Sequence, residues 1–277
     1  MKNIFIMCGG RTGSSLLTGH FPCDENMFNV WEFWSMHIPH FWRIIKSIKK
    51  AGNGDLPKSF VEFMSNVYDV NPTNLRGLKA TVAKFPYTLD MLSDAIEILE
   101  KNTNFKYFMH KNINHANFLG GWTQEDIVKM ADVVIVNYRK SILDCWVSNT
   151  RAAESKIWLS KEYIKDYDQK VYFNDKHFVK FAEEYVVEYE DIKNKIKKHN
   201  KPHIVIEYET LCKQQDSCKY IADKLKELGI SDIKISKPNM VKQSTEREYY
   251  DNIFKKNHAE KFREQYSEIK KYTSYKF

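Results

Sequence analysis

The stretch that decides the fold is residues 4–17, which read Ile-Phe-Ile-Met-Cys-Gly-Gly-Arg-Thr-Gly-Ser-Ser-Leu-Leu. The first five residues are apolar and are followed by glycines, a pattern typical of a buried parallel strand. Glycines at 9, 10 and 13 allow the backbone to take positive φ or to approach a ligand closely. Ser14 and Ser15 offer hydroxyls and can cap a helix. We therefore predict a strand, a tight turn and a helix that begins at Ser14.

Such a turn is an anion site, because several N–H groups and the positive end of a helix dipole point at one spot. The commonest nucleotide-binding loop reads G-x-x-x-x-G-K-[ST]. Here Ser14 follows Gly13, and the cation, Arg11, precedes that glycine, so the lysine that would reach β- and γ-phosphates is missing. Taken alone, the loop fits a glycine turn without a ligand equally well.

The composition bounds the class of protein. The chain has 277 residues, 43% of them hydrophobic, which suits one large α/β domain or two small ones. The net charge of +7 suits an anionic ligand but does not establish nucleic-acid binding, and we expect no nucleic-acid partner. No stretch approaches the length of a membrane span, so we expect no membrane partner. Five cysteines without metal spacing predict reduced thiols and a cytoplasmic protein.

Strand patterns alternate with helix patterns along the chain. This predicts an α/β fold, a three-layer sandwich with a central parallel sheet flanked by helices, in a single domain spanning 1–277. The tail, 238–277, is polar and rich in Lys and Tyr, and we assign no element to it. Thr123 followed by Asp126 is close to a capping box. Further strands are expected at 76–82, 105–111, 131–138 and 203–208, and helices at 14–21, 38–50, 60–68, 89–99, 122–130, 141–153, 161–199 (with a break near Asn174) and 218–228.

A cationic rim is expected where the strands end, because ligands of open parallel sheets bind at the carboxyl ends of strands. The expected ends present Arg11, Lys79, His110 with Lys111, and Arg139, without an acidic metal cluster.

The second informative stretch is 139–152, Arg-Lys-Ser-Ile-Leu-Asp-Cys-Trp-Val-Ser-Asn-Thr-Arg-Ala. Arg139 at a strand end and Ser148 two turns along the next helix can clamp one phosphate, the first by charge and the second by its hydroxyl. The alternative is a solvated helix face with a surface contact between Asp144 and Arg151, which this stretch alone favours.

Taken together, the two stretches resemble the sulfotransferases that use 3′-phosphoadenylyl sulfate (PAPS). In that family a first-strand loop P-[KR]-[ST]-G-[ST]-[ST] holds the 5′-phosphosulfate, and a strand-end Arg with a Ser eight or nine residues later binds the 3′-phosphate. Residues 10–15 and the pair Arg139 and Ser148 match these motifs, with Gly10 in place of the usual proline. Residues 145–152 and 77–79 are similar to Q-A-V-S-x-x-R-A and G-L-K of the bacterial trehalose-type branch, and 206–211 to the family's Y-E-[DT]-L.

The resemblance implies transfer of a sulfuryl group from PAPS to a hydroxyl or amine of a small-molecule or carbohydrate acceptor, in line and without metal. Arg11 would contact the sulfuryl group, with Lys111 or Lys79 adding charge. Helical insertions on the acceptor side are expected at about 23–70 and 155–200, which match nothing in the family. The backbone N–H groups that would hold the 5′-phosphate belong to Thr12, Gly13, Ser14 and Ser15.

A general base should take the acceptor's proton. Glu32 is the first candidate, because it follows the loop helix and its aromatic neighbours can raise its pKa by desolvation; a surface Glu is the alternative. His110 and His115 are further candidates, although a lone His in an apolar setting is more often structural. Arg247 is a weak candidate for the 3′-phosphate and otherwise charged surface.

Two other functions stay open at this stage. A P-loop nucleotide or small-molecule kinase would need the missing Gly-Lys-[ST] and an Asp at a strand end, whereas Asp132 begins its strand. A binding module without chemistry would keep the fold alone. The sequence identifies neither the acceptor nor the oligomeric state.

Overall fold

The structure is a computed structural model that describes residues 1–30, 58–60, 62–63, 89–113, 123–155, 170–238 and 254–277. The expected strand at 76–82 and the expected helix at 38–50 lie outside these residues. The named elements, in chain order, are β1 (Lys2–Cys8), α1 (Ser14–Thr18), β2 (Met27–Asn29), α4 (Leu89–Asn102), β3 (Tyr107–Ile113), α5 (Gln124–Met130), β4 (Val133–Tyr138), α6 (Ile142–Ser155), α7 (Asp175–Lys198), β5 (His203–Glu207), α8 (Tyr208–Lys213), α9 (Ser217–Lys226), α10 (Lys256–Ile269) and the 3₁₀ helix η3 (Lys270–Tyr272).

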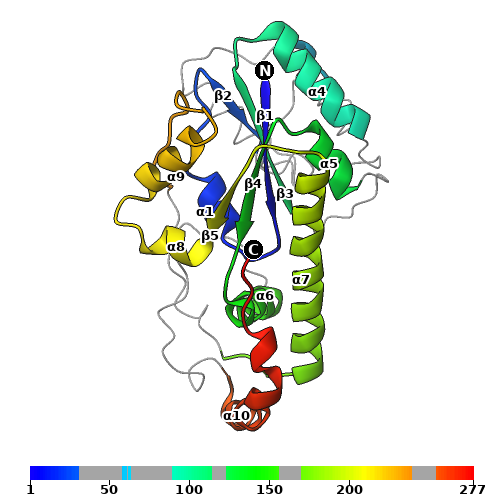
Figure 1. The fold of residues 1–277 in the computed structure, drawn as a ribbon, viewed down its shortest axis with the longest axis vertical. Coiled ribbons are helices and arrows are strands. Elements are labelled where there is room, and N and C mark those ends of the chain that lie inside the picture. The colour runs from blue at the N-terminus through cyan, green and yellow to red at the C-terminus, as the bar shows by residue number, and fades with distance from the viewer. Residues whose placement is uncertain (31–57, 61, 64–88, 114–122, 156–169, 239–253) are drawn as a thin grey trace.

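The central feature is a five-stranded sheet in the order β2-β3-β1-β4-β5, with every pair parallel (Figure 1). The chain places β2 and β3 on one side of β1 and then crosses to β4 and β5 on the other. At the end of β1, Cys8 lies opposite Ile113 of β3 and Asn137 of β4. The loop after β1 therefore emerges at the point where the strand order reverses, the place where open parallel sheets bind ligands.

Both faces of the sheet are covered, which explains why its strands read as continuous apolar runs. On β1, Ile4 and Ile6 pack with α1, α8 and α9, while Phe5 and Met7 pack with α4, α5 and α7 on the opposite face. All four side chains are fully buried. Figure 1 shows the two groups of helices on either side of the sheet. The predicted α/β three-layer arrangement is confirmed.

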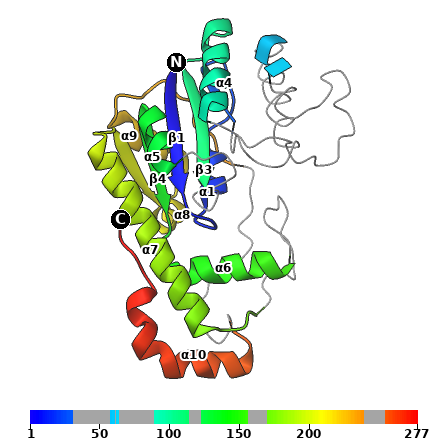
Figure 2. The ribbon, with the colours of Figure 1, turned by 90° about the vertical axis from the view of Figure 1, so that its right-hand side faces the viewer.

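α6 lies across the carboxyl ends of the strands, and α10 lies beyond it (Figure 2). An aromatic cluster joins α6, α7 and α10; its rings are Trp146, Phe173, Phe178, Phe254 and Phe262. Residues after η3 hold the start of α6, since Thr273 accepts a hydrogen bond from the Ile142 N–H at 2.9 Å and the Tyr275 N–H donates to Lys140 at 3.0 Å. The tail to which no element was assigned thus completes the support beneath the sheet.

α10 was missed because its apolar residues are widely interrupted by charges. Ala259, Phe262 and Ile269 are buried, and Tyr266 packs against the same core. Their spacing of 3, 4 and 3 residues is helical, but it is diluted by Lys, Glu and Arg. β2, with three residues, and α8, with six, were missed because they are too short to show a periodic pattern.

Local signals at helix starts gave mixed outcomes. The capping box of α5 is formed in both directions between Thr123 and Asp126, and α7 begins after Asn174, whose side chain caps it. The predicted capping by Ser14 and Ser15 is wrong: α1 begins after Gly13, at φ 78°, without a side-chain cap, and both serines lie inside the helix. Of the helices that the structure describes, none is long and apolar enough to cross a membrane.

We predict that Phe262→Ala lowers the free energy of unfolding by about 3–5 kcal/mol, because a fully buried ring leaves a cavity in the aromatic cluster. Glu264→Ala, at an exposed position of the same helix, should change it by less than about 0.5 kcal/mol. Urea denaturation of the two variants measures the difference. Equal, small effects would mean that α10 contributes nothing to the core.

Candidate functional site

The β1–α1 loop, residues 9–13, is a tight turn closed by a hydrogen bond between two of its own residues. The Thr12 hydroxyl is fully buried and donates to the Gly9 carbonyl at 2.9 Å. Arg11 and Gly13 both have positive φ, 62° and 78°. α1 has no side-chain cap, and the first N–H groups of a helix have no partner within it. Such N–H groups can bind an anion.

A single aromatic ring packs against both the loop and the end of β4. Tyr208, the first residue of α8, lies so close to Gly13 that a Cβ there would come within 2.1 Å of its ring. The Arg139 guanidinium carbon lies 4.8 Å from the centroid of the same ring. Gly13 is therefore required both by its positive φ and by this contact, and Tyr208 fixes the separation between the loop and Arg139.

Two carboxylates lie beside Arg139, at distances longer than those of strong hydrogen bonds. Its Nη2 lies 3.4 Å from Asp144 Oδ2 and its Nε lies 3.6 Å from Glu209 Oε1, while the side chain is only 12% exposed. Burial disfavours the charge, but the carboxylate of Asp144, with that of Glu209, raises the pKa of Arg139 overall. The buried Nε has no hydrogen-bond acceptor among the described residues. The Arg139 guanidinium therefore still has an N–H group that can donate to an anion.

Two contacts join the loop to α6. Arg11 Nε donates to Ser148 Oγ at 3.1 Å, and Cys145 Sγ donates to the Gly10 carbonyl at 3.1 Å. Burial raises the pKa of Cys145 to about 12, so the group is a neutral thiol and serves as a donor. The two sequence stretches that carry the resemblance therefore meet in space.

Lys111 and His110 point to opposite faces of β3, as neighbours on a strand must. Lys111 is 1% exposed and its Nζ donates to Ser15 Oγ at 3.3 Å, which places a cation at the first turn of α1. His110 packs edge-on against Phe5, with ring centroids 5.6 Å apart, within the core. The geometry places Lys111 at the loop and favours a structural role for His110.

Two tyrosines of α7, one helical turn apart, hold the strand ends, and sequence reasoning missed both. The Tyr189 hydroxyl accepts from the Gly9 N–H at 2.8 Å and donates to the Asn137 carbonyl at 2.7 Å. The Tyr185 hydroxyl donates to the Arg139 carbonyl at 2.8 Å and accepts from its N–H at 2.9 Å. The four-residue spacing indicated a shared helix face, but nothing in it indicated which backbone groups the hydroxyls reach.

Glu188 is the third residue of α7 at the loop, and it too was missed. Its Oε2 lies 3.7 Å from the position that a Cβ on Gly9 would take. Its Oε1 is buried and has no hydrogen-bond partner in the described part of the chain. Burial, and then the neighbouring carboxylates of Asp191 and Glu184, raise the pKa of Glu188 to about 8.

The alternative interpretation of the second stretch was a solvated helix face, and the structure covers this face only in part. Arg151 is 3% exposed, whereas Asp144, which lies beside Arg139, is 31% exposed and Ser148 is half-buried. Asp132 precedes β4, where its carboxylate accepts from the Asn3 N–H, at the opposite end of the strand from the loop. Four candidates lie outside the described residues: Glu32, Lys79, His115 and Arg247.

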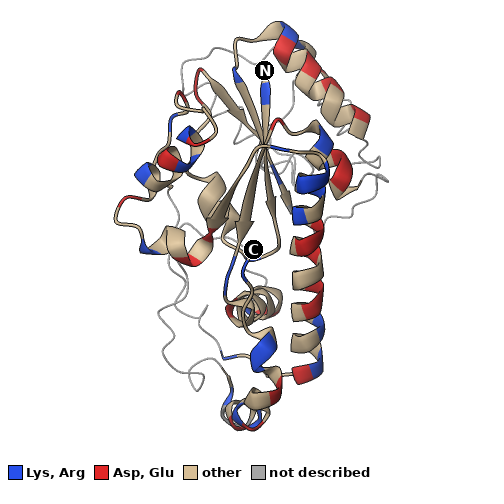
Figure 3. Cartoon of the chain, viewed as in Figure 1, with Lys and Arg blue, Asp and Glu red and all other residues tan. Residues whose placement is uncertain are grey.

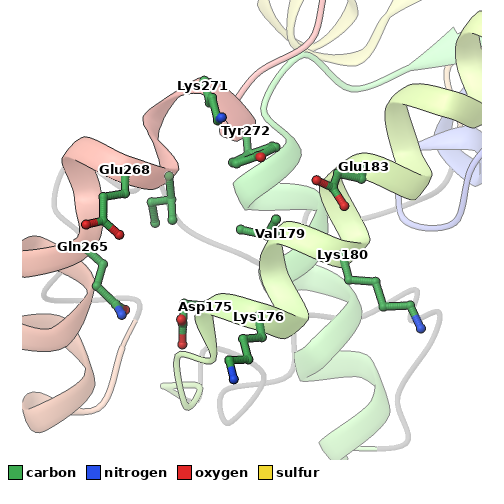
Figure 4. A pocket seen from close by; sticks show the side chains of 10 residues that line it. Asp175, Lys176, Val179, Lys180, Glu183, Gln265, Glu268, Lys271 and Tyr272 are labelled. Atoms are coloured by element: carbon green, nitrogen blue, oxygen red, sulfur yellow. The ribbon is translucent and has the colours of Figure 1, made fainter.

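Two surface hollows in the described part of the chain lie away from the loop. One, of ≈ 450 Å³, lies between α7 and α10 (Figure 4), and another, of ≈ 480 Å³, is lined by α8 and α9. The first is lined by groups of both signs, among them Lys176, Glu183, Glu268 and Lys271. Figure 3 shows mainly acidic residues along α4 and residues of both signs along α7. Both hollows are lined by acidic and basic groups together.

A scan against protein-family models and a search of curated proteins found no match to this chain.

We predict that Gly13→Ala lowers the free energy of unfolding by about 3 kcal/mol or more, since it adds a ring clash to the cost of positive φ. Gly229→Ala is the matched control, because Gly229 has φ 71° with open space around it, and should cost about 1 kcal/mol. Denaturant titration compares them. If the two substitutions lower the free energy of unfolding equally, the contact between Gly13 and Tyr208 does not affect stability.

We predict that Glu188→Gln stabilises the protein progressively as pH rises. The folded-state pKa of Glu188, about 8, exceeds the ordinary 4.5, so the stability that the neutral group provides is complete below pH 4.5 and lost as pH rises through 8. Between pH 4.5 and 8, the free energy of unfolding of the wild type should decrease relative to that of the variant by at most about 1.4 kcal/mol per pH unit. Urea titrations at pH 5, 7 and 9 test this, and a pH-independent difference would contradict it.

Proposed function

We propose that this protein is a sulfotransferase that moves a sulfuryl group from PAPS to a hydroxyl or amine of a small-molecule or carbohydrate acceptor. The observation that carries the proposal is the 3.1 Å hydrogen bond from Arg11 to Ser148. It joins the β1–α1 loop to α6, so the two stretches that resemble the PAPS-binding motifs form one site. That site lies at the switch point of a parallel sheet.

The donor set fits a ligand with two separated anionic groups. Arg11, Lys111 and the first-turn N–H groups of α1 can hold the 5′-phosphosulfate. Arg139, whose buried Nε lacks an acceptor among the described residues, and the Ser148 hydroxyl can hold the 3′-phosphate. The Tyr208 ring contacts both Gly13 and Arg139, and it thereby sets the distance between the loop and Arg139.

Catalysis in this proposal is positioning and charge stabilisation. PAPS, when bound, supplies a sulfuryl group attached to a phosphate leaving group. Arg11 stabilises the charge that develops between the sulfuryl and phosphate groups during in-line displacement, and Lys111 adds to that field. Tyr189 fixes the loop against β4, so these cations need little reorganisation during the reaction. The proposed general base is Glu32.

The first test is thermal unfolding with adenosine 3′,5′-bisphosphate, with Mg²⁺-ATP in parallel. A ligand that binds only the folded state adds roughly 2.7 kcal/mol at a hundred times its Kd. We expect a shift with the bisphosphate that is lost in Arg139→Gln and Ser148→Ala. Lys140→Ala, an exposed cation next to Arg139, should keep the shift.

Other outcomes separate the alternatives. A shift with Mg²⁺-ATP and none with the bisphosphate would reject the proposal in favour of a kinase. No shift with either ligand would leave a binding module without this chemistry. Loss of the bisphosphate shift in Lys140→Ala as well would indicate unspecific charge attraction.

A further inference from the structure

The position of Glu188 creates an electrostatic conflict at the proposed site. Its Oε2 lies 3.7 Å from the Cβ position of Gly9, at the start of the loop that would receive an anion. An ionised carboxylate at this distance from the loop would repel that anion strongly, because buried charges are poorly screened. A neutral carboxylic acid would instead offer one O–H donor.

Within the described residues, the charged groups that act on the Glu188 carboxyl are acidic neighbours. On α7, Glu184 and Asp191 are the acidic neighbours; Glu184 lies 3.8 Å from Lys180, and Asp191 is paired with Lys195. On the same helix, Tyr189 is a buried neutral hydroxyl.

The elements packed against α7 bring a thiol and further charged groups toward Glu188. α6 contributes Cys145, a neutral thiol, and the charges of Arg139, Arg11, Glu188 and Glu209 all act on that thiol. Arg11 is engaged with Ser148 at 3.1 Å. Glu188 Oε1 is meanwhile buried without a hydrogen-bond partner among the described residues.

We propose that Glu188 takes part in anion binding at the β1–α1 loop as a neutral carboxylic acid, so that anion binding at this site is coupled to a proton on Glu188. The inference rests on the proposed function in that it takes the loop as the anion site. The coupling is reciprocal: a bound anion favours the protonated group, and ionisation of the group weakens binding of the anion. Glu188 is thereby a binding residue whose protonation sets the affinity.

The size of the effect follows from the titration of the free site. With a pKa of about 8, about one molecule in thirty keeps the proton at pH 9.5, whereas most keep it at pH 7.5. The phosphates of adenosine 3′,5′-bisphosphate, with second pKa values near 6, are already ionised across this range. Affinity should therefore fall more than about tenfold between pH 7.5 and 9.5.

The experiment is calorimetric titration of adenosine 3′,5′-bisphosphate, and separately of sulfate, at pH 7.5, 8.5 and 9.5 and constant ionic strength. The wild type should lose more than about tenfold in affinity for the bisphosphate, while Glu188→Gln, which stays neutral, should lose less than about threefold. Glu183→Gln, an exposed Glu on the same helix, should behave like the wild type. At pH 8.5, binding to the wild type should be accompanied by uptake of a fraction of a proton. The measured binding enthalpy should therefore depend on the ionisation enthalpy of the buffer.

The outcomes separate this inference from the proposed function. Bisphosphate binding without pH dependence, or with the same dependence in Glu188→Gln, overturns the role of Glu188 and leaves the function intact. Absence of bisphosphate binding with sulfate binding that loses its pH dependence in Glu188→Gln rejects PAPS and supports Glu188. Absence of binding by both probes at every pH overturns both.

Discussion

The site depends on one hydroxyl. Tyr189 accepts from the Gly9 N–H and donates to the Asn137 carbonyl, and it thereby ties the end of β1 to the end of β4 from within the core. Burial raises the pKa of Tyr189 far above its ordinary value, so the hydroxyl keeps the proton that it donates. β1 ends at Cys8, so Tyr189 continues the connection between the two strands one residue beyond the end of β1. Tyr185 of the same helix holds the Arg139 backbone, so α7 fixes both the loop and the end of β4.

Much of the sheet and of the helices was predictable, because those elements are long and strongly patterned. β1 and β4 are nearly continuous apolar runs, and the capping box of α5 is local chemistry that needs no tertiary context. α10 and the cap of α1 were not predictable in this way. The first is stabilised by packing against a distant aromatic cluster, and the second is decided by Gly13 in a left-handed conformation that Tyr208 restricts.

The candidate site was only half visible in the sequence. Arg11, Arg139, Ser148 and Lys111 stand in motif positions or at strand ends, so residue type and spacing were enough to single them out. Tyr185, Glu188 and Tyr189 belong to a helix that is one uniform amphipathic pattern, in which nothing distinguishes a core tyrosine from one whose hydroxyl holds a loop. Their meaning comes from contacts between residues far apart in the chain, which periodicity does not encode.

The anchoring of α6 has a consequence for the order in which the chain folds on the ribosome. Thr273 and Tyr275 hold the backbone at Lys140 and Ile142, and a β-bridge pairs Ser141 with Ser274. These anchors emerge on the order of ten seconds of synthesis after α6 itself. The strands and α7 can therefore assemble during translation before α6 is fastened beneath them. Ser148 would reach its place beside Arg11 late, and the growing chain would spend that interval with a sheet but without the contact between the loop and α6.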